Sequence, residues 1–432
     1  MAELQPFSGY RFHLEKPEDL ERYIAPPYDM LDNRMINELY NKCESNIVRI
    51  IQNRPEEDDT SNADRHRRAA TTLSDWIATG IIRRDDEPSL YVYEQQFDDA
   101  SCGILRRIVR TGVVALVKLS DFREGIVFPH EATLSGPKKD RYELLDATRT
   151  CTEQIFGLLN DDGTFYSFLR EQCSRDPDGV FTDPDGVVHS LYRCSNRDVI
   201  DRLIALAHDR SILIADGHHR YETALNFYHD RKREEYGYTQ MTLVSTADPG
   251  LIIRPFHRLV KKAGNPCLMR EKLKDFFELE DYGKVESNAI FGFLTAEDDR
   301  IMVYLDSDDG HLYGCTLNSS GREMLSSLLP EQSDRWKQLP VSIINVLVIN
   351  TILGLPLDGK ILHDVVEYVN DVEKSVSLCR DNATFHGGFF IRPASIRMVS
   401  SIVASGERMP QKSTNFFPKM YSGLVLHRME CS

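Results

Sequence analysis

The chain has 432 residues, enough for about two or three domains and a large buried active site. Its formal net charge of −15 argues against a protein that wraps duplex nucleic acid, because such binding depends mainly on Lys and Arg. The scattered cysteines include no close pair, which indicates neither a disulfide framework nor a zinc knuckle and fits a reducing cytosol. Residues 1–14 do not resemble a signal peptide, and no segment has the roughly 18 apolar residues of a membrane span. The expected location is therefore cytoplasmic, with neither nucleic acid nor membrane as a partner.

Apolar periodicity along the chain predicts a mixed α/β (α+β) fold. Helices are expected at residues 33–40, 64–79, 142–148, 164–172, 198–208, 218–228, 268–279, 355–372 and 395–404. Strands are expected at residues 47–51, 90–97, 106–119, 153–159, 211–215, 290–294, 300–305 and 387–392. A boundary near residues 261–266 would divide the chain into a core at 1–260 and a C-terminal α/β lobe at 261–432.

The segment Asp216-Gly217-His218-His219-Arg220 follows an expected strand and enters an expected helix. Such a turn gathers backbone N–H groups and the positive end of the helix dipole, where anions bind. Gly217 would let a phosphate approach closely, and Arg220 could bind its oxygens in a bidentate way. His218 and His219 could donate hydrogen bonds, while Asp216 could cap the helix or hold a metal ion. A capped helix with surface histidines is the plain alternative; zinc is disfavoured because adjacent helical histidines face different ways.

The segment from Pro129 to Arg141 carries many functional groups with little periodicity, which is typical of a functional loop. His130 and Glu131 are candidates for the catalytic base, and residues 135–137 predict a tight turn. Positive charge for phosphate binding would come from Lys138, Lys139 and Arg141. Phosphoryl transfer needs this combination, because its catalysis is mostly positioning and charge neutralisation. A charged surface loop is the plain alternative.

Two weaker clusters complete the set of candidate residues. Asp29 follows two prolines in a rigid turn. A polar loop near the C-terminus, at 407–414, contains Arg408, Lys412, Ser413 and Thr414. Taken alone, a solvated tail explains this loop better.

Seven strings together resemble the widespread prokaryotic family known as domain of unknown function 1015, and the resemblance runs nearly end to end. They are residues 25–29, 91–97, 129–141, 145–149, 214–225, 248–260 and 407–423. Arg149 closes one of them and is a further candidate residue. Over a shorter stretch, residues 216–220 resemble the Asp-Gly-His-x-Arg signature of the ParB and sulfiredoxin superfamily, in which this turn and helix hold nucleotide phosphates.

The resemblance implies a ParB/sulfiredoxin-like phosphate-binding core within residues 1–260, and it implies a kinase that phosphorylates free L-serine, because some members of that superfamily do so. Asp216, His218, His219 and Arg220 match the phosphate and metal motif. The superfamily's glutamate base lies upstream of the motif in a segment that does not align with this sequence, so Glu131 is the candidate chosen from the residues themselves. The expected enzyme is a Mg²⁺-dependent phosphotransferase with ATP, ADP or pyrophosphate as donor.

Two other functions stay open on sequence alone. One is a ParB-like switch that binds nucleotide without phosphorylating a metabolite, although the acidic charge and the lack of a basic stretch count against it. The other is a phosphoserine phosphatase, in which water is the acceptor. A metal-dependent nuclease is a weaker option for the same charge reason.

Overall fold

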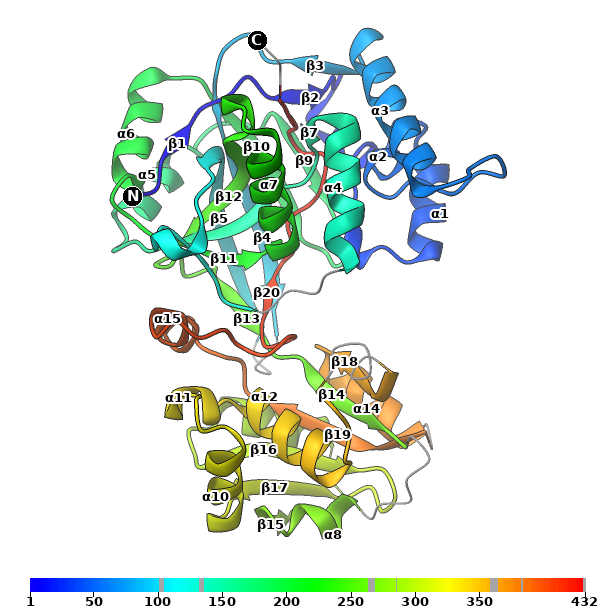
Figure 1. Ribbon diagram of the computed structural model, residues 1–432, viewed down its shortest axis with the longest axis vertical. Helices are drawn as coiled ribbons and strands as arrows, with labels where there is room; N and C mark the ends of the chain where they lie inside the picture. The colour runs from blue at the N-terminus through cyan, green and yellow to red at the C-terminus, as the bar shows by residue number, and fades with distance from the viewer. Residues whose placement is uncertain are drawn as a thin grey trace.

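The computed structural model describes residues 1–100, 105–131, 136–262, 269–284, 286–357, 364–381 and 384–429. Within them the chain forms two lobes, each built around its own sheet (Figure 1). The larger sheet has the order β6-β11-β8-β12-β5-β4-β10-β9, with β1 also paired to β5. These strands are β1 (Leu4–Gln5), β4 (Leu90–Asp99), β5 (Arg106–Lys118), β6 (Val127–Pro129), β8 (Ile155–Leu159), β9 (Gly179–Thr182), β10 (Val188–Cys194), β11 (Ile212–Asp216) and β12 (Tyr238–Ser245).

Both parallel and antiparallel pairs occur in this sheet. β11 runs parallel to β6 and β12 runs parallel to β8, whereas β4 and β5 pair antiparallel. The expectation of a mixed α/β fold is therefore confirmed, while the ParB/sulfiredoxin-like core stays a prediction. Among the described residues no helix is long and apolar enough to cross a bilayer.

Alternating side chains of β5 enter two different cores, as the two-residue period of a strand requires. Val113, Ala115 and Val117 pack under the helices α5 (Thr164–Glu171), α6 (Arg197–Ala207) and α7 (His218–Arg231). Val114 and Leu116 face the other way, against apolar residues of the C-terminal segment. Farther along the first face, α4 (Gly136–Thr148) lies beside α7 and packs on α3 (Asn62–Ala78).

The second lobe is an antiparallel sheet with the order β15-β17-β16-β19-β14-β18. Its strands are β14 (His257–Lys261), β15 (Phe277–Asp281), β16 (Arg300–Asp306), β17 (Leu312–Leu317), β18 (Val366–Val369) and β19 (Phe385–Ile391). One face is covered by α8 (Met269–Leu273), α10 (Ser319–Leu328), α12 (Pro340–Ile343) and the π-helix Ile344–Ile352. The other face is covered by α9 (Ser287–Thr295) and α14 (Val372–Asp381).

After the second lobe the chain returns to the first. Helix α15 (Ile396–Ala404) lies at the junction, β20 (Asn415–Phe417) pairs with β13 (Ile252–Arg254), and β21 (His427–Arg428) pairs with β7 (Thr150–Cys151). Short elements elsewhere are α1 (Asn33–Lys42), α11 (Asp334–Lys337), β2 (Tyr10–Phe12) and β3 (Ile82–Arg84). The expected division into residues 1–260 and 261–432 stays a prediction. In the structure, β20 and β21, which follow residue 261, pair with strands of the first part.

The strand expected at residues 47–51 was wrong, because this stretch is the helical turn α2 (Val48–Ile51). The Asn46 side chain accepts a hydrogen bond from the Val48 N–H at 2.9 Å, and the N–H groups of Ile50 and Ile51 both donate to the carbonyl of Ile47. A short apolar run has no periodicity that separates a buried strand from a buried helical turn. The local hydrogen bonds of Asn46 decide the outcome.

Three further expectations fail in the second lobe. Residues 290–294 belong to helix α9, whose buried Ile290, Phe293 and Leu294 follow the helical spacing. The helix expected at 268–279 is reduced to α8, after which the chain joins the sheet as β15. In the helix expected at 355–372, residues 358–363 lie outside the described part, and Val366–Val369 is strand β18, paired with β14. In each of the last two, sheet pairing outweighs the local helical pattern.

Candidate functional site

Gly217 lies at the point where β11 ends and α7 begins, as the sequence predicts. Its φ of +87° favours glycine, and a Cβ there would lie 3.0 Å from Arg220 Nε. The first hydrogen bond of the helix runs from the Tyr221 N–H to the Gly217 carbonyl at 3.0 Å. The N–H groups of the preceding turn therefore point out of the helix end, where the dipole is positive.

Two cations hold the carboxylate of Asp216. Arg220 Nη2 donates to Asp216 Oδ2 at 3.1 Å, and Lys419 Nζ donates to Oδ1 at 3.2 Å. Arg220 Nη1 also donates to the carbonyl of Gln154 at 2.5 Å, which fixes the guanidinium. Burial would raise the pKa of Asp216, but Lys419 and Arg220 outweigh it and hold that pKa well below its usual value. Asp216 is therefore ionised, and its carboxylate lies between the cations Arg220 and Lys419 at the start of α7.

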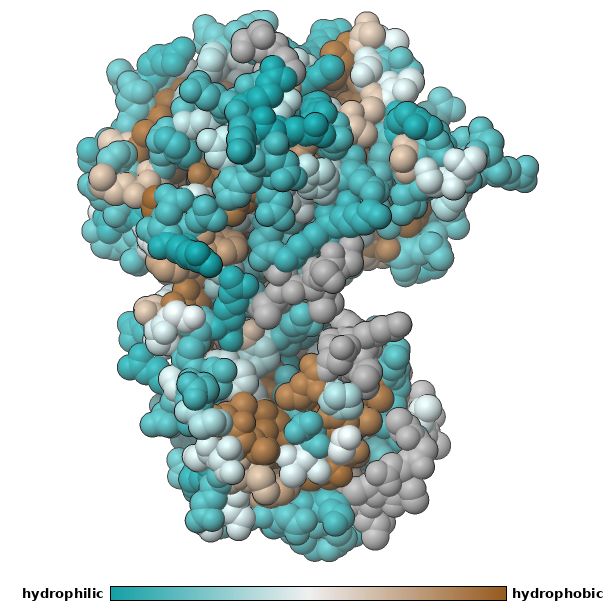
Figure 2. Space-filling view, in the orientation of Figure 1, coloured by the Kyte–Doolittle hydropathy of each residue, from teal (hydrophilic) through white to brown (hydrophobic). Residues whose placement is uncertain are grey.

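A pocket of about 300 Å³ opens in front of this turn. Both lobes contribute to it, since Phe256 precedes β14 and Asn370 follows β18. Its lining residues are Tyr28, Asp29, Met30, Glu131, Ala215, Asp216, Gly217, His218, His219, Arg220, Phe256, Asn370, Lys412, Thr414, Asn415 and Lys419. Figure 2 shows that the molecule narrows between the two lobes.

Glu131 is a carboxylate of this pocket with an unusual environment. Its side chain is 19% exposed, and its Oε1 accepts the backbone N–H of Lys412 at 2.5 Å. Burial raises the pKa of Glu131 to about 7, although the Lys412 N–H and the charges of Lys412 and Lys419 oppose the shift. A carboxylate with this pKa can take a proton near neutral pH.

Asp29 lies in the same pocket, at the end of the Pro26–Pro27 turn. It stays accessible to solvent, yet the surrounding protein displaces part of its water and raises its pKa, and the charge of Asp216 adds to the shift. Arg220 and Lys419 act in the opposite direction. The structure thus brings together Asp29, Glu131 and Asp216, three carboxylates from distant parts of the chain.

His130 is fully buried and does not line the pocket. Its Nδ1 lies 2.6 Å from the Ile214 carbonyl, and its Nε2 lies 2.7 Å from the Thr414 hydroxyl. A carbonyl can only accept, so Nδ1 carries the proton and Nε2 accepts from Thr414. Burial lowers the pKa of His130 to about 4, which keeps the ring neutral. Neutral His130 thus joins strand β11 to the loop that carries Thr414.

His218 is held in the same neutral network. The Nε2 atom of His218 accepts a hydrogen bond from the backbone N–H of His130 at 3.3 Å. Burial and the neighbouring His130 hold the pKa of His218 well below its usual value. His219, the next residue, also lines the pocket, and its role in phosphate binding stays a prediction.

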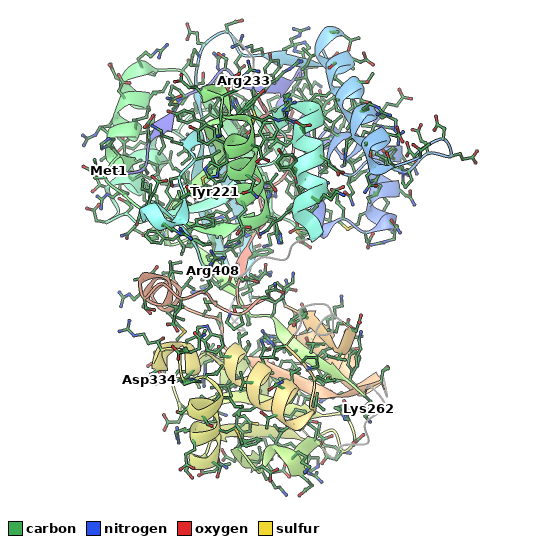
Figure 3. The ribbon with its side chains drawn as sticks, viewed as in Figure 1. Met1, Tyr221, Arg233, Lys262, Asp334 and Arg408 are labelled. Atoms are coloured by element: carbon green, nitrogen blue, oxygen red, sulfur yellow. The ribbon has the colours of Figure 1, made fainter. Side chains whose placement is uncertain are left out.

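Several candidates from the sequence lie away from the pocket wall. Lys138 pairs with Glu222 of α7, and Lys139 is 85% exposed. Arg141 is buried behind the pocket, with its guanidinium 4.2 Å from the ring centroid of Tyr28. Arg149 lies over the ring of Phe227 at 5.0 Å, Arg408 lies over the ring of Phe122 at 5.5 Å, and the Ser413 hydroxyl donates to the carbonyl of Pro410. Figure 3 shows Arg408 at the junction of the lobes, away from Tyr221 on α7.

Sequence reasoning missed Lys419, Tyr28, Phe256 and Asn370 in the pocket. Lys419 lies within one of the strings that carry the family resemblance, but no spacing or periodicity connects it to Asp216. Residues 132–135, including Ser135 of the expected tight turn, lie outside the described residues.

In the described part of the chain, no group of three or more His, Cys, Asp or Glu side chains is arranged to hold a metal ion. Mg²⁺ sites in phosphate-handling proteins commonly use only one or two carboxylates together with substrate phosphates. Asp29 and Asp216 provide such a pair, because they line one pocket and the charge of Asp216 affects the pKa of Asp29. This donor set fits Mg²⁺ in the presence of a phosphate ligand.

No curated protein matches the chain. Among solved structures, a free serine kinase in complex with AMP aligns with 71% of this chain and 89% of its own, with a TM-score of 0.34 and 13% identity. A conserved hypothetical protein from Pyrococcus furiosus aligns with 72% of this chain and 94% of its own, with a TM-score of 0.36 and 12% identity. A C-terminally truncated SbnI from Staphylococcus aureus aligns with 71% of this chain and 84% of its own, with a TM-score of 0.34 and 10% identity. Superpositions this loose transfer no activity to the chain.

The comparison with family models rests on the sequence itself. The model described as "Protein of unknown function (DUF1015)" matches residues 4–342, well over half of the chain. The matched range includes Asp29, Glu131 and the turn at 216–220, whereas Lys412 and Lys419 follow it. The chain belongs to this family, the DUF1015 proteins of unknown function.

Proposed function

We propose that the chain is a Mg²⁺-dependent small-molecule phosphotransferase that converts free L-serine to O-phospho-L-serine with ATP, ADP or pyrophosphate as donor. The observation that carries the proposal is the pairing, in one pocket, of a carboxylate whose pKa is raised to about 7 with the cationic start of α7. A phosphotransferase needs both, a base for the acceptor hydroxyl and positive groups for the phosphates. L-Serine as acceptor rests on the resemblance of residues 216–220 to the motif of free-serine kinases.

In the proposed reaction the hydroxyl oxygen of the acceptor attacks the phosphorus of the donor, and Glu131 takes the hydroxyl proton. The bond between this phosphorus and the bridging oxygen of the donor breaks, and its electron pair leaves with that oxygen. Arg220 and the N–H groups at the start of α7 bind the phosphate oxygens and neutralise their charge. Phe256 and Asn370 approach from the second lobe and limit the access of water.

The pair Asp29 and Asp216 would hold Mg²⁺ together with the phosphates. When bound, the ion adds positive charge where charge develops during phosphoryl transfer. Asp216 also orients Arg220 and Lys419, because each of its oxygens accepts a hydrogen bond from one of them. His219 is placed by the same helix turn and would donate to the donor phosphates.

Phosphorus NMR of the purified protein with Mg²⁺ and L-serine tests the proposal, with ATP, ADP and pyrophosphate offered in separate tubes. We expect a phosphoserine signal with one donor. The variants His219→Ala and Arg220→Ala should lose the signal and keep a native circular dichroism spectrum, whereas His208→Ala, at the exposed end of α6, should match the wild type.

Other outcomes identify the competing functions. Nucleotide binding without phosphoserine in any tube would support the nucleotide-binding switch. Release of phosphate from phosphoserine without a donor would support the phosphatase. Wild-type turnover by both His219→Ala and Arg220→Ala would overturn the assignment of the site.

A further inference from the structure

We infer that Lys419 is a phosphate-contacting residue of the pocket and that the buried pair Arg110 and Gln95 are positioning residues that hold it there. This inference rests on the proposed function, since it concerns the phosphates bound at the start of α7. It adds a cation from the C-terminal segment to the site and two residues of the central hairpin β4–β5 behind it.

Arg110 and Gln95 together bind three consecutive backbone carbonyls. Arg110 Nη1 donates to the carbonyl of Phe417 at 2.9 Å, and Nη2 donates to the carbonyl of Pro418. Gln95 Nε2 donates to the carbonyl of Lys419 at 2.9 Å. Gln95 Oε1 in turn accepts from Arg110 Nε at 3.1 Å and from Nη2, so the two side chains fix each other.

The environment of Arg110 argues for a role beyond packing. The residue is 1% exposed, and the hydrogen bonds it donates to described residues all end on neutral oxygens of Gln95, Phe417 and Pro418. Burial lowers the pKa of Arg110 to about 10, which leaves the guanidinium charged at neutral pH. The charge of the buried Asp248 favours the charged form of Arg110, but the oxygens of Asp248 accept the N–H groups of Thr111 and Gly250. A buried charge whose hydrogen bonds all end on neutral oxygens is costly, and an apolar residue over the Phe156 ring would fill the same space at lower cost. The charge is therefore best explained by the carbonyls that it holds.

The hydrogen bonds of Arg110 and Gln95 to the carbonyls of residues 417–419, called the clamp here, fix the direction of the Lys419 side chain. With the carbonyls of residues 417–419 fixed, Lys419 reaches Asp216 Oδ1 at 3.2 Å and lines the pocket. An ammonium group has three donors, and the bond to Asp216 uses one of them. The others can bind phosphate oxygens at the start of α7 without breaking that bond. Arg220 donates to the other oxygen of the Asp216 carboxylate, so the two cations would flank a phosphate bound at the start of α7.

The test is pyrophosphate binding to the full chain, measured by calorimetry with Mg²⁺ and without L-serine, so that no turnover is needed. Lys419→Met should weaken binding at least about tenfold, because one charge-assisted contact is lost. Arg110→Met should weaken it similarly while near-ultraviolet circular dichroism stays native. Lys274→Met, which removes an exposed lysine of the second lobe, should bind as the wild type does.

A double variant separates positioning from general structural support. If Arg110 acts through Lys419, Lys419→Met combined with Arg110→Met should bind pyrophosphate no more weakly than Lys419→Met alone. Arg110→Lys, which keeps the charge, should recover part of the affinity. If Arg110→Met does not fold, Gln95→Leu replaces it in the same comparison of single and double variants.

Lysine acylation followed by mass spectrometry gives a second readout. Pyrophosphate should protect Lys419 in the wild type and not in Arg110→Met. Unchanged affinity in Lys419→Met, together with a loss in Arg220→Ala, would overturn this inference and leave the proposed function intact. Failure of the wild type to bind any phosphate donor would instead overturn the proposed function.

Discussion

Lys419 Nζ lies 3.2 Å from Asp216 Oδ1, although 203 residues separate the two in the sequence. The contact joins the end of strand β11 to the segment that follows β20, so the cationic part of the pocket has two origins. Asp216 therefore organises charge from both segments.

Glu131→Gln should reduce turnover about 10²- to 10⁴-fold, because the amide cannot accept the hydroxyl proton. The pKa of Glu131 is raised to about 7, so kcat/KM of the wild type should rise with pH up to about pH 7 and then level off. This rise should be missing from the residual activity of Glu131→Gln. A pH profile of both proteins between pH 5 and 9 checks the prediction, and an unchanged rise in the variant would assign the base to another group.

The same substitution should make the fold more stable at alkaline pH. The pKa of Glu131 is raised from 4.5 to about 7 in the folded chain, so the folded state binds more protons than the unfolded state between these values. Stability is therefore lost as the pH rises through this window, by at most about 3 kcal/mol. Glu131→Gln removes the loss and can still accept the Lys412 N–H.

Urea unfolding at pH 5 and pH 8 measures this effect. The difference in free energy of unfolding between variant and wild type should be larger at pH 8, in favour of the variant. A variant that is less stable than the wild type at pH 8 would show that Glu131 is not held in a destabilised charged form.

Gly217→Ala should destabilise the fold and weaken pyrophosphate binding. The positive φ costs about 1–2 kcal/mol for alanine, and the new Cβ would lie 3.0 Å from the Arg220 guanidinium. Gly186→Ala is the control, since Gly186 has a φ of +79° but nothing within 4 Å of its Cβ position. Equal losses of stability and equal pyrophosphate affinity in the two variants would remove any special role for contact with Arg220. Urea unfolding and calorimetry supply the measurements.

His130→Ala should lower the stability by about 2–4 kcal/mol, because it leaves the Ile214 carbonyl and the Thr414 hydroxyl without their partner. Its effect on turnover should be the same from pH 6 to pH 9, since the pKa of His130 is lowered to about 4 and the ring stays neutral there. Thr414→Val removes one of the two contacts and should lose about half as much stability. A pH-dependent effect of His130→Ala would instead indicate proton transfer by the ring.

The turn at Asp216–Arg220 could be predicted because its signals are local. A short apolar strand, a glycine at the turn and a run of polar residues at the helix start are adjacent in the sequence. Glu131 was chosen from a different local signal, the concentration of functional groups in residues 129–141. Where the local pattern was short and apolar, as at residues 47–51, it could not decide between a strand and a helical turn.

The other pocket residues depend on long-range pairing that no local pattern carries. Lys419 reaches the site through the pairing of β13 with β20 and through the clamp of Arg110 on residues 417 and 418. Phe256 precedes β14 and Asn370 follows β18, and the antiparallel pairing of these two strands brings both residues to the pocket. Lys138 and Lys139 show the reverse case, since their charges suggested phosphate binding but α4 directs them to Glu222 and to solvent.

The ribbon formed by β13 and β20 has a consequence for biosynthesis. The two strands flank the second lobe in the sequence, so β20 leaves the ribosome only after the whole second sheet has been translated. Until then the nascent chain carries Asp216 and Arg220 without Lys419 to share the carboxylate. The pocket can therefore be completed only late in translation, and a premature stop before residue 419 would yield a chain that has the turn at residues 216–220 but lacks Lys419 in the pocket wall.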